Sequence, residues 1–293
     1  MRRAVVCLLA VSLTAMFGCG RLVSVSREFS VSEPWDDYER VVVRTRNGAV
    51  ELRSADVEQV HVSGTVRAGG YTLSEAQDNL DEVTVHVEPG ADHPDTLLVE
   101  ARYPDVLQHR SVGASFVIEV PEPCAARIET GNGVIHVQGL KGEVDLDTSN
   151  GRVSVTDVSG SVRVETSNGR VEAKDIRGGL VAESSNGRIT AERITGDCVL
   201  NTSNGGIRLV TTPDAVGRIE LRSSNGSIHA TVPEDLNAAM KLRTSNGKVN
   251  VSLDDAAFKE IDFGKSWFRG IANEGTGQVT IVTSNGSITV DSH

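Results

Sequence analysis

Hydrophobic and polar residues alternate along most of the chain, in short runs that return with a fixed period. After Asn150 the apolar positions are 153, 155, 158, 162 and 164, and the same phase returns eighteen residues later at 171, 173, 176, 180 and 182. A spacing of two is typical of β-strands that bury one face. The step of three after Val155 recurs at the same place in each unit, and it predicts a corner there.

An Asn-Gly dipeptide marks each unit of this pattern. There are eight such dipeptides from Asn132 on, and the first four intervals between them are 18 residues, the next two are 21 and the last is 39. Thr-Ser or Ser-Ser precedes seven of the eight dipeptides, so the corner repeats with its neighbours and not alone. The predicted repeat corners are Asn132, Asn150, Asn168, Asn186, Asn204, Asn225, Asn246 and Asn285.

Two architectures fit an Asn-Gly corner that repeats every 18 to 21 residues. An antiparallel meander needs only suitable turn residues. A solenoid favours identical residues at equivalent positions, because each residue contacts its own copy one rung away. The preserved neighbours favour the second, so we predict an all-β, single-stranded β-solenoid, parallel β-helix-like, with Asn side chains stacked as an amide ladder. One rung buries too few apolar residues to offset its ordering entropy, so several rungs must stack and both ends need caps.

The regularity of the pattern divides the chain. Residues 1–18 have the layout of a secretory signal, namely two arginines, an apolar run and a small residue before Cys19. We expect a tether at 19–37, an irregular β region that caps the solenoid at 38–131, and regular rungs at 132–293. Within the cap, Thr72 and Glu75 form a capping-box pattern that predicts one short helix.

An insertion at 254–277 accounts for the 39-residue interval. It contains four aromatic residues in a chain whose aromatic content is only 4%. The favoured interpretation is that they cover the open end of the stack. The alternative is an aromatic contact surface at Trp267 and Phe268, helped by Lys265 and Arg269.

Charge and cysteine content exclude several classes of ligand and site. The formal charge is −11, and −13 without the signal, which argues against nucleic acid and against electrostatic binding to anionic lipid. No Cys and His cluster has the spacing of a zinc site, and we expect no metal and no cofactor. Cys124 and Cys198 should lie about four rungs, roughly 19 Å, apart in a solenoid, beyond the ~7 Å limit for a disulfide. We therefore expect two free thiols.

Charged residues also form columns in the repeat. Acidic residues stand three places before successive Asn corners, and arginines stand two places after them. We interpret the two columns as a solvated ladder of ion pairs across one corner, worth little per pair. The acidic column consists of Asp147, Glu165 and Glu183, and the basic column of Arg152, Arg170 and Arg188.

Two resemblances add to this interpretation. Residues 16–19, Met-Phe-Gly-Cys, resemble the lipobox of bacterial lipoproteins, which implies lipidation of Cys19. The segment Thr-Gly-Asn-Gly-Val-Ile-His-Val at 130–137 and the repeated Thr-Ser-Asn-Gly resemble a bacterial β-strand-repeat family labelled "putative adhesin", a domain of unknown function. That resemblance covers most of 38–291. It implies an exported β-solenoid and supplies no catalytic residues.

Together these observations predict a non-enzymatic, adhesin-like binding or scaffold module. It would be exported and lipid-anchored in the cell envelope, in the outer membrane. Its partners would be the membrane, through the lipid, and an envelope protein or polysaccharide, but not nucleic acid. The alternatives are an assembly protein that stacks through solenoid ends, and a carbohydrate-active β-helix enzyme.

Overall fold

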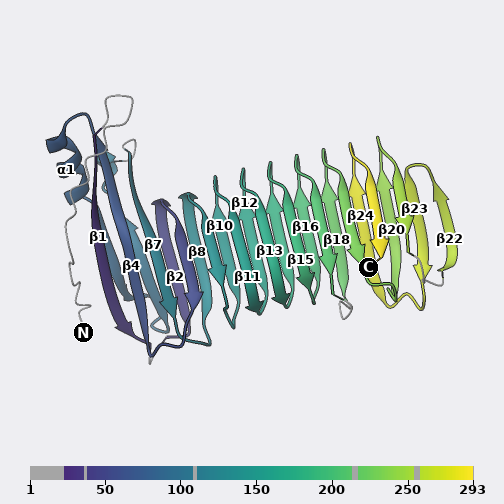
Figure 1. The fold of residues 1–293 in the computed structure, drawn as a ribbon, viewed down its shortest axis with the longest axis horizontal. Helices are drawn as coiled ribbons and strands as arrows, with labels where there is room; N and C mark the ends of the chain where they lie inside the picture. The colour runs from purple at the N-terminus through teal and green to yellow at the C-terminus, as the bar shows by residue number, and fades with distance from the viewer. Residues whose placement is uncertain (1–22, 36–37, 108–110, 213–216, 254–257, 293) are drawn as a thin grey trace. The chain divides into compact units, whose positions relative to one another are not determined.

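The computed structural model describes residues 23–35, 38–107, 111–212, 217–253 and 258–292, and it confirms the predicted β-solenoid. The chain forms two compact units, Met1–Gly142 and Glu143–His293. In both units the regular rungs contribute one strand to each of two facing sheets, and equivalent strands of successive rungs pair in parallel (Figure 1). Residues 1–18 and Cys19 lie outside the described residues.

In unit 1 one sheet has the strand order β1-β4-β7-β3-β9, and the facing sheet has the order β8-β2-β6-β5. Parallel rungs lie side by side in its interior, and antiparallel strands β1, β4 and β5 close the edges. The strands are β1 (Val23–Pro34), β2 (Arg40–Asn47), β3 (Val50–Ser54), β4 (Gln59–Gly70), β5 (Thr84–Pro89), β6 (Thr96–Arg102), β7 (Val112–Val120), β8 (Ala125–Asn132) and β9 (Ile135–Gln138), with a 3-10 turn at Asp105–Leu107.

Strand β1 corrects the expected tether at 19–37. It pairs antiparallel with β4 over its whole length, and Val25, Phe29 and Val31 are buried. These residues are separated by four and by two positions, which is the alternation typical of a strand, and the tether assignment overlooked it. The predicted helix is confirmed as α1 (Leu73–Asp81), where the Thr72 hydroxyl accepts from the Glu75 N–H at 3.1 Å.

In unit 2 every rung sends one strand to sheet A and one to sheet B. Sheet A has the order β11-β13-β15-β17-β19-β25-β21, and sheet B has the order β22-β23-β20-β24-β18-β16-β14-β12-β10. The strands of sheet A are β11 (Val153–Ser159), β13 (Val171–Arg177), β15 (Ile189–Ile194), β17 (Ile207–Thr211), β19 (Ile228–Val232), β21 (Val249–Ser252) and β25 (Ile288–Ser292). Those of sheet B are β10 (Val144–Thr148), β12 (Val162–Thr166), β14 (Leu180–Ser184), β16 (Cys198–Thr202), β18 (Arg218–Ser223), β20 (Ala238–Thr244), β22 (Phe258–Gly264), β23 (Trp267–Ala272) and β24 (Gly277–Thr283).

The core of unit 2 is the set of columns that the periodicity predicts. Val162 pairs in register with Leu180, and Leu180 with Cys198, so each side chain rests on its counterpart in the next rung. All three side chains are at most 2% exposed. Small aliphatic residues stacked in this way fill the space between two sheets without large aromatic groups.

The step of three after Val155 is not a corner, as predicted, but a bulge inside a continuous strand. Asp157, Asp175 and Arg193 each have φ near +55° at this place. A single left-handed residue shifts the alternation by one, so Val158 still faces inward. The chain turns between the two sheets at Asn-Gly, and again at Gly160 and Gly178, between the end of one sheet A strand and the start of the next sheet B strand.

The last rung does not stand last in the stack. Strand β24 lies between β18 and β20 in sheet B, and β25 lies between β19 and β21 in sheet A (Figure 1). The insertion makes this possible, because its antiparallel hairpin β22–β23 carries the chain back past β20. The hairpin also extends sheet B by two strands.

Two kinds of side chain, a Thr or Ser hydroxyl and an Asn amide, build the Asn-Gly corners. The Thr202 hydroxyl accepts from the Gly205 N–H at 3.2 Å and donates to the Gly187 carbonyl of the preceding rung at 3.1 Å. The Asn204 amide donates to the Asn186 side chain at 2.8 Å, one step of the predicted ladder. In unit 2, side-chain hydrogen bonds of 2.6 to 2.8 Å link Asn150, Asn168, Asn186, Asn204, Asn225, Asn285 and Asn246 in that order.

Replacing Thr202 with valine should lower the free energy of unfolding by about 2 kcal/mol, because the buried Gly205 N–H and Gly187 carbonyl would both lose their partner. Urea unfolding of the two proteins measures the difference. Thr202→Ser is the matched control, since Ser184 makes the same pair of bonds in the preceding rung. If valine and serine gave equal stability, the hydroxyl bonds would not support the corner.

Candidate functional site

A polar groove of about 760 Å³ runs along sheet B of unit 2, beside the Asn-Gly corners. We call it the sheet B groove. It crosses several rungs, because each rung contributes chemically similar residues at the same register. Most of its lining side chains carry a hydroxyl group or a charge, and the exceptions are one amide and one valine. The lining residues are Asp147, Thr148, Glu165, Thr166, Ser167, Glu183, Ser184, Ser185, Asn201, Thr202, Ser203, Glu220, Arg222, Ser223, Ser224, Val282 and Ser284.

One outward row sets the charge of the groove. Register pairing places Asp147, Glu165 and Glu183 on the adjacent strands β10, β12 and β14. The row then continues through Asn201 on β16 and Arg222 on β18. Neighbouring strands are about 4.8 Å apart, so the groove is acidic at one end and turns basic within a few rungs.

The middle of the groove contains an unsatisfied acceptor. The Asn201 side-chain oxygen is buried and has no hydrogen-bond partner within the described part of the chain. Asn201 lines the groove between Glu183 and Arg222 in the register. Buried polar atoms are nearly always paired in folded proteins, so this oxygen is an exception in the wall of the groove, and its burial keeps it out of reach of a bound molecule.

The ion pairs on either side of the Asn-Gly corners differ from the predicted ladder across the corner. Glu165 accepts from Arg163 of its own strand at 2.9 Å, and Arg170 lies 3.6 Å from Glu172 of sheet A. Ion pairs form along a strand and not across the corner, because residues two apart on a strand point to the same side.

Glu220 forms ion pairs with two arginines of its own strand at the groove. Its side chain is about 10% exposed and contacts Arg218 and Arg222. Burial favours the neutral acid, but the hydrogen bonds from the two arginines outweigh it, and the pKa of Glu220 is lowered. Glu220 and these arginines largely satisfy one another.

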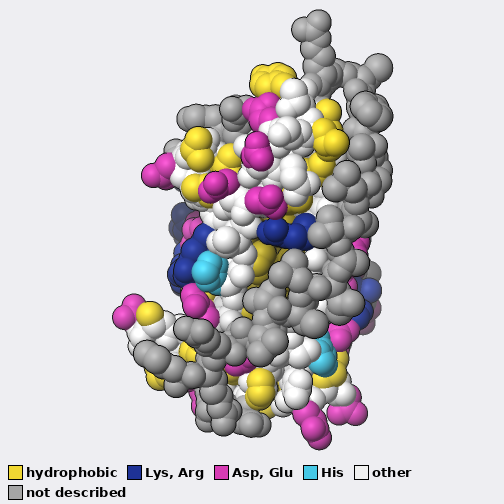
Figure 2. All heavy atoms as spheres, turned by 90° about the vertical axis from the view of Figure 1, so that its left-hand side faces the viewer, with side chains coloured by type: hydrophobic (Ala, Val, Ile, Leu, Met, Phe, Trp, Pro, Cys, Tyr) yellow, Lys and Arg dark blue, Asp and Glu magenta, His cyan; other side chains and the backbone are white. Residues whose placement is uncertain are grey.

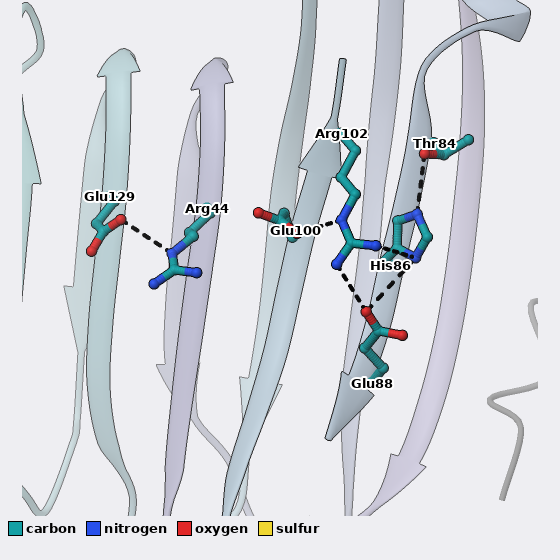
Figure 3. Close-up of polar contacts among 7 residues, drawn as sticks. All are labelled: Arg44, Thr84, His86, Glu88, Glu100, Arg102 and Glu129. Carbon is teal, nitrogen blue, oxygen red and sulfur yellow. Dashed lines mark hydrogen bonds and ion pairs between the residues drawn. The ribbon is translucent and has the colours of Figure 1, made fainter. Parts of the chain in front are cut away.

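Unit 1 carries a second charged face on its β2 sheet. Arg102 donates to Glu100 and to Glu88, and Arg44 donates to Glu129 at 3.2 Å (Figure 3). The hydrogen bond to Glu100 is the main cause of a raised Arg102 pKa. Acidic, basic and apolar side chains are also interspersed on the left-hand side of Figure 1, which faces the viewer in Figure 2. The charged side chains of the β2 sheet named above are paired with one another, so this sheet is a weaker candidate for a binding site than the sheet B groove.

Both cysteines of the described chain are free and buried. Burial raises the pKa of the Cys198 thiol to about 12, with a smaller contribution from Asp197, and burial alone raises that of Cys124 to about 12. The two free thiols that the sequence predicts are confirmed. Buried and protonated, neither is suited to act as a nucleophile.

These thiols should make the protein less stable above pH 9. An unfolded thiol ionises near pH 9 and the native ones only near 12, so unfolding releases protons between these values. The free energy of unfolding should then fall by up to about 1.4 kcal/mol per pH unit for each thiol. Urea unfolding at pH 8 and 10.5 tests this, and Cys198→Ala should reduce the loss. An unchanged pH dependence in that variant would contradict the assignment.

The two aromatic residues proposed as a contact surface lie on opposite faces of β23. Trp267 is outward and 37% exposed, whereas Phe268 turns inward and packs edge-to-face on Phe258 at 5.6 Å. They therefore do not form one surface. Trp267 instead belongs to the outward row of the groove, because Arg222 pairs with Val282, Val282 with Arg243, and Arg243 with Trp267.

Sequence reasoning missed the groove itself. Its signal was present in the Ser that stands one place before seven of the eight Asn corners and in the residue three places before each, which is polar at most of them. Only the structure shows that these positions border a concave surface.

The described residues contain no group of three or more His, Cys, Asp and Glu side chains arranged to hold a metal ion. None of their helices has the length and apolar character needed to cross a bilayer.

Comparison with known proteins gives one decisive match. The family model described as Toastrack DUF4097 matches residues 13–291. No curated protein has a significant match. Among solved structures, a "putative adhesin" from Bacteroides fragilis is 10% identical, with a TM-score of 0.45 and coverage of 91% of this chain and 96% of that one. A "putative lipid binding protein" from Parabacteroides distasonis is 14% identical, with a TM-score of 0.41 and the same coverage. Such identities and scores transfer no binding partner.

Proposed function

The chain belongs to the Toastrack DUF4097 family, whose function is unknown, and from this premise we propose that it is a non-enzymatic binding module of the bacterial cell envelope. Its sheet B groove receives an extended polar polymer, an envelope polysaccharide. An envelope protein segment is the second ligand class that the same groove fits. A lipid on Cys19 attaches the module to the membrane.

The observation that carries this proposal is the groove. The surface crosses several rungs and presents a serine hydroxyl at each step of about 4.8 Å, with carboxylates beside the hydroxyls at one end. A polymer with repeating hydroxyl groups can form similar hydrogen bonds along such a surface.

Binding without cleavage follows from the chemistry of the lining. Glu165 and Glu220 are engaged by arginines, and the free thiols are buried and protonated. Repeated, similar carboxylates favour recognition of a repeating chain, whereas acid–base catalysis needs two groups in contrasting environments.

A blocking substitution tests the groove. Ser185 is exposed in its lining, so Ser185→Trp should fill the middle of the groove and weaken binding of a polysaccharide at least about tenfold, equivalent to 1.4 kcal/mol. Thr190→Trp, on the outer side of sheet A, is the control. A panel of defined polysaccharides is titrated calorimetrically, and the recovered chains are sized. Equal effects of the two substitutions would exclude the groove, and shortened chains would show an enzyme.

An assembly role is the second candidate, and the hairpin edge favours it. Strand β22 is the outer strand of sheet B, and Phe263 on it is 70% exposed. An unpaired strand edge can add a strand from another molecule. Sedimentation of the wild type and Phe263→Lys at several concentrations decides: a dimer that the substitution dissolves supports assembly, and monomers throughout exclude it.

A further inference from the structure

The outward row continues past the groove onto the end of sheet B, where its charge is positive. Arg243 on β20 follows Arg222 and Val282 in the register, and Trp267 on β23 follows Arg243. One row over, Lys241 pairs in register with Arg269. We call Lys241, Arg243, Trp267 and Arg269 the basic end. It lies on a protein whose formal charge is −11.

The three cations of the basic end are exposed and have no ion-pair partner among the described residues. Asp262 stands opposite Arg269 in the register without forming an ion pair. Most other arginines on outward faces behave differently, as the engagement of Arg102 and Arg44 by carboxylates shows (Figure 3). Unpaired cations gathered at one place on an acidic protein favour an anionic ligand.

The Trp267 ring lies flat on its neighbouring strand. Its register partner on β22 is Gly264, and a Cβ atom added there would stand 2.6 Å from the indole Nε1 and 3.1 Å from Cε2. Only the missing side chain of Gly264 leaves room for the ring in this position. With Trp267 still 37% exposed, the ring presents a face to solvent.

We infer that the basic end is a subsite for an anionic sugar unit of the polymer that lies in the sheet B groove. The Trp267 ring stacks on the apolar face of the sugar, and Arg243, Lys241 and Arg269 bind its acidic group. The acid is a carboxylate, sulfate or phosphate carried by the sugar ring. This inference rests on the proposed function and names the chemistry of its ligand.

The spacing of the basic end suits one sugar ring with its acidic group. Arg243 and Trp267 stand on adjacent strands, about 4.8 Å apart, and Lys241 lies two residues along β20 from Arg243, about 7 Å away. A guanidinium can bind a carboxylate or phosphate through two parallel hydrogen bonds. The aromatic ring and the cations therefore surround a single unit from below and from one side.

The test compares an acidic polysaccharide with a neutral one. The full chain is titrated with polygalacturonate and with neutral galactan. We expect polygalacturonate to bind, with an affinity that falls as salt is added. Trp267→Ala and the double variant Arg243→Gln/Arg269→Gln should each weaken it about tenfold or more, or 1.4 kcal/mol. Trp267→Tyr should retain most of the affinity, and Gly264→Ala should weaken binding by displacing the ring. Arg208→Gln, an exposed arginine on sheet A, is the matched control.

Three results would overturn the subsite. Binding of galactan as tightly as polygalacturonate, blocked by Ser185→Trp but unaffected by Trp267→Ala, would remove the anionic subsite and leave the groove standing. Loss of affinity for anionic phosphatidylglycerol vesicles in Trp267→Ala, without any polygalacturonate binding, would reassign the basic end to a membrane surface. Failure of every polysaccharide to bind would remove the proposed function and the subsite together.

Discussion

Gly187→Ala should destabilise unit 2 by about 3–5 kcal/mol, the largest effect expected for one added methyl group in this protein. A Cβ atom at this corner would stand 1.6 Å from the Gly169 carbonyl oxygen of the preceding rung. That oxygen is backbone, so relief requires two rungs to move apart. Moving them would also disturb the hydroxyl bond that Thr202 makes to the Gly187 carbonyl and the Asn ladder beside it.

The matched control for this corner lies in the same rung. A Cβ atom on Gly179 would have only the Asp197 carbonyl oxygen near it, at 3.6 Å, an ordinary contact. Gly179→Ala should therefore change the free energy of unfolding by less than about 1 kcal/mol. Urea unfolding of both variants measures the difference, and equal stability would mean that the rungs are not stacked as closely as the corner geometry requires.

Ala182→Asp should prevent unit 2 from folding or remove most of its stability. Ala182 is fully buried between the two sheets, in register with Val164 and Leu200. A carboxylate there would have no cation to pair with and only aliphatic neighbours in its column, and breaking such a site costs about 3–5 kcal/mol. This is a large part of the ~5–15 kcal/mol that stabilises a typical protein.

The adjacent residue separates burial from charge. Val181 precedes Ala182 on β14 and faces outward, beside Arg163 in the register. Val181→Asp adds the same charge to the same strand and should cost less than about 0.5 kcal/mol. Circular dichroism and urea unfolding of the two variants test the alternation. Similar losses in both would mean that β14 does not bury one face.

The interior of the solenoid could be predicted because stacked rungs favour the same type of residue at each equivalent position. Columns such as Val162, Leu180 and Cys198 were visible from a period of two within rungs and eighteen between them, and the Asn corners from their neighbours. The short helix was predictable from Thr72 and Glu75 for a different reason, since its cap is a local hydrogen bond.

The order of the rungs could not be predicted from the sequence. The similarity between rungs that reveals their interior also makes their positions in the stack hard to tell apart. Every rung offers similar columns, so β24 fits between β18 and β20 as well as it would at the end. The bulge at Asp157 was hidden because a left-handed residue and a corner shift the alternation alike. Strand β1 was missed because no Asn-Gly corner marks it.

Prediction of the candidate site depends on knowing which face of the sheet each residue occupies, and the sequence shows this only in part. Trp267 and Phe268 are neighbours on a strand, so alternation alone should have placed them on opposite faces. That Trp267 falls in the row of Arg243 and Arg222 depends on non-sequential strand pairing, which the sequence does not reveal.

Carboxyl footprinting in the presence of a polysaccharide tests most directly whether the sheet B groove is the binding surface. Glu183 lines the groove, whereas Glu192 lies on a strand of sheet A. A water-soluble carbodiimide with an amine should label both in the free protein. With the polysaccharide bound, mass spectrometry should show Glu183 protected and Glu192 labelled as before. Protection of Glu192 with unchanged labelling of Glu183 would contradict the assignment of the groove.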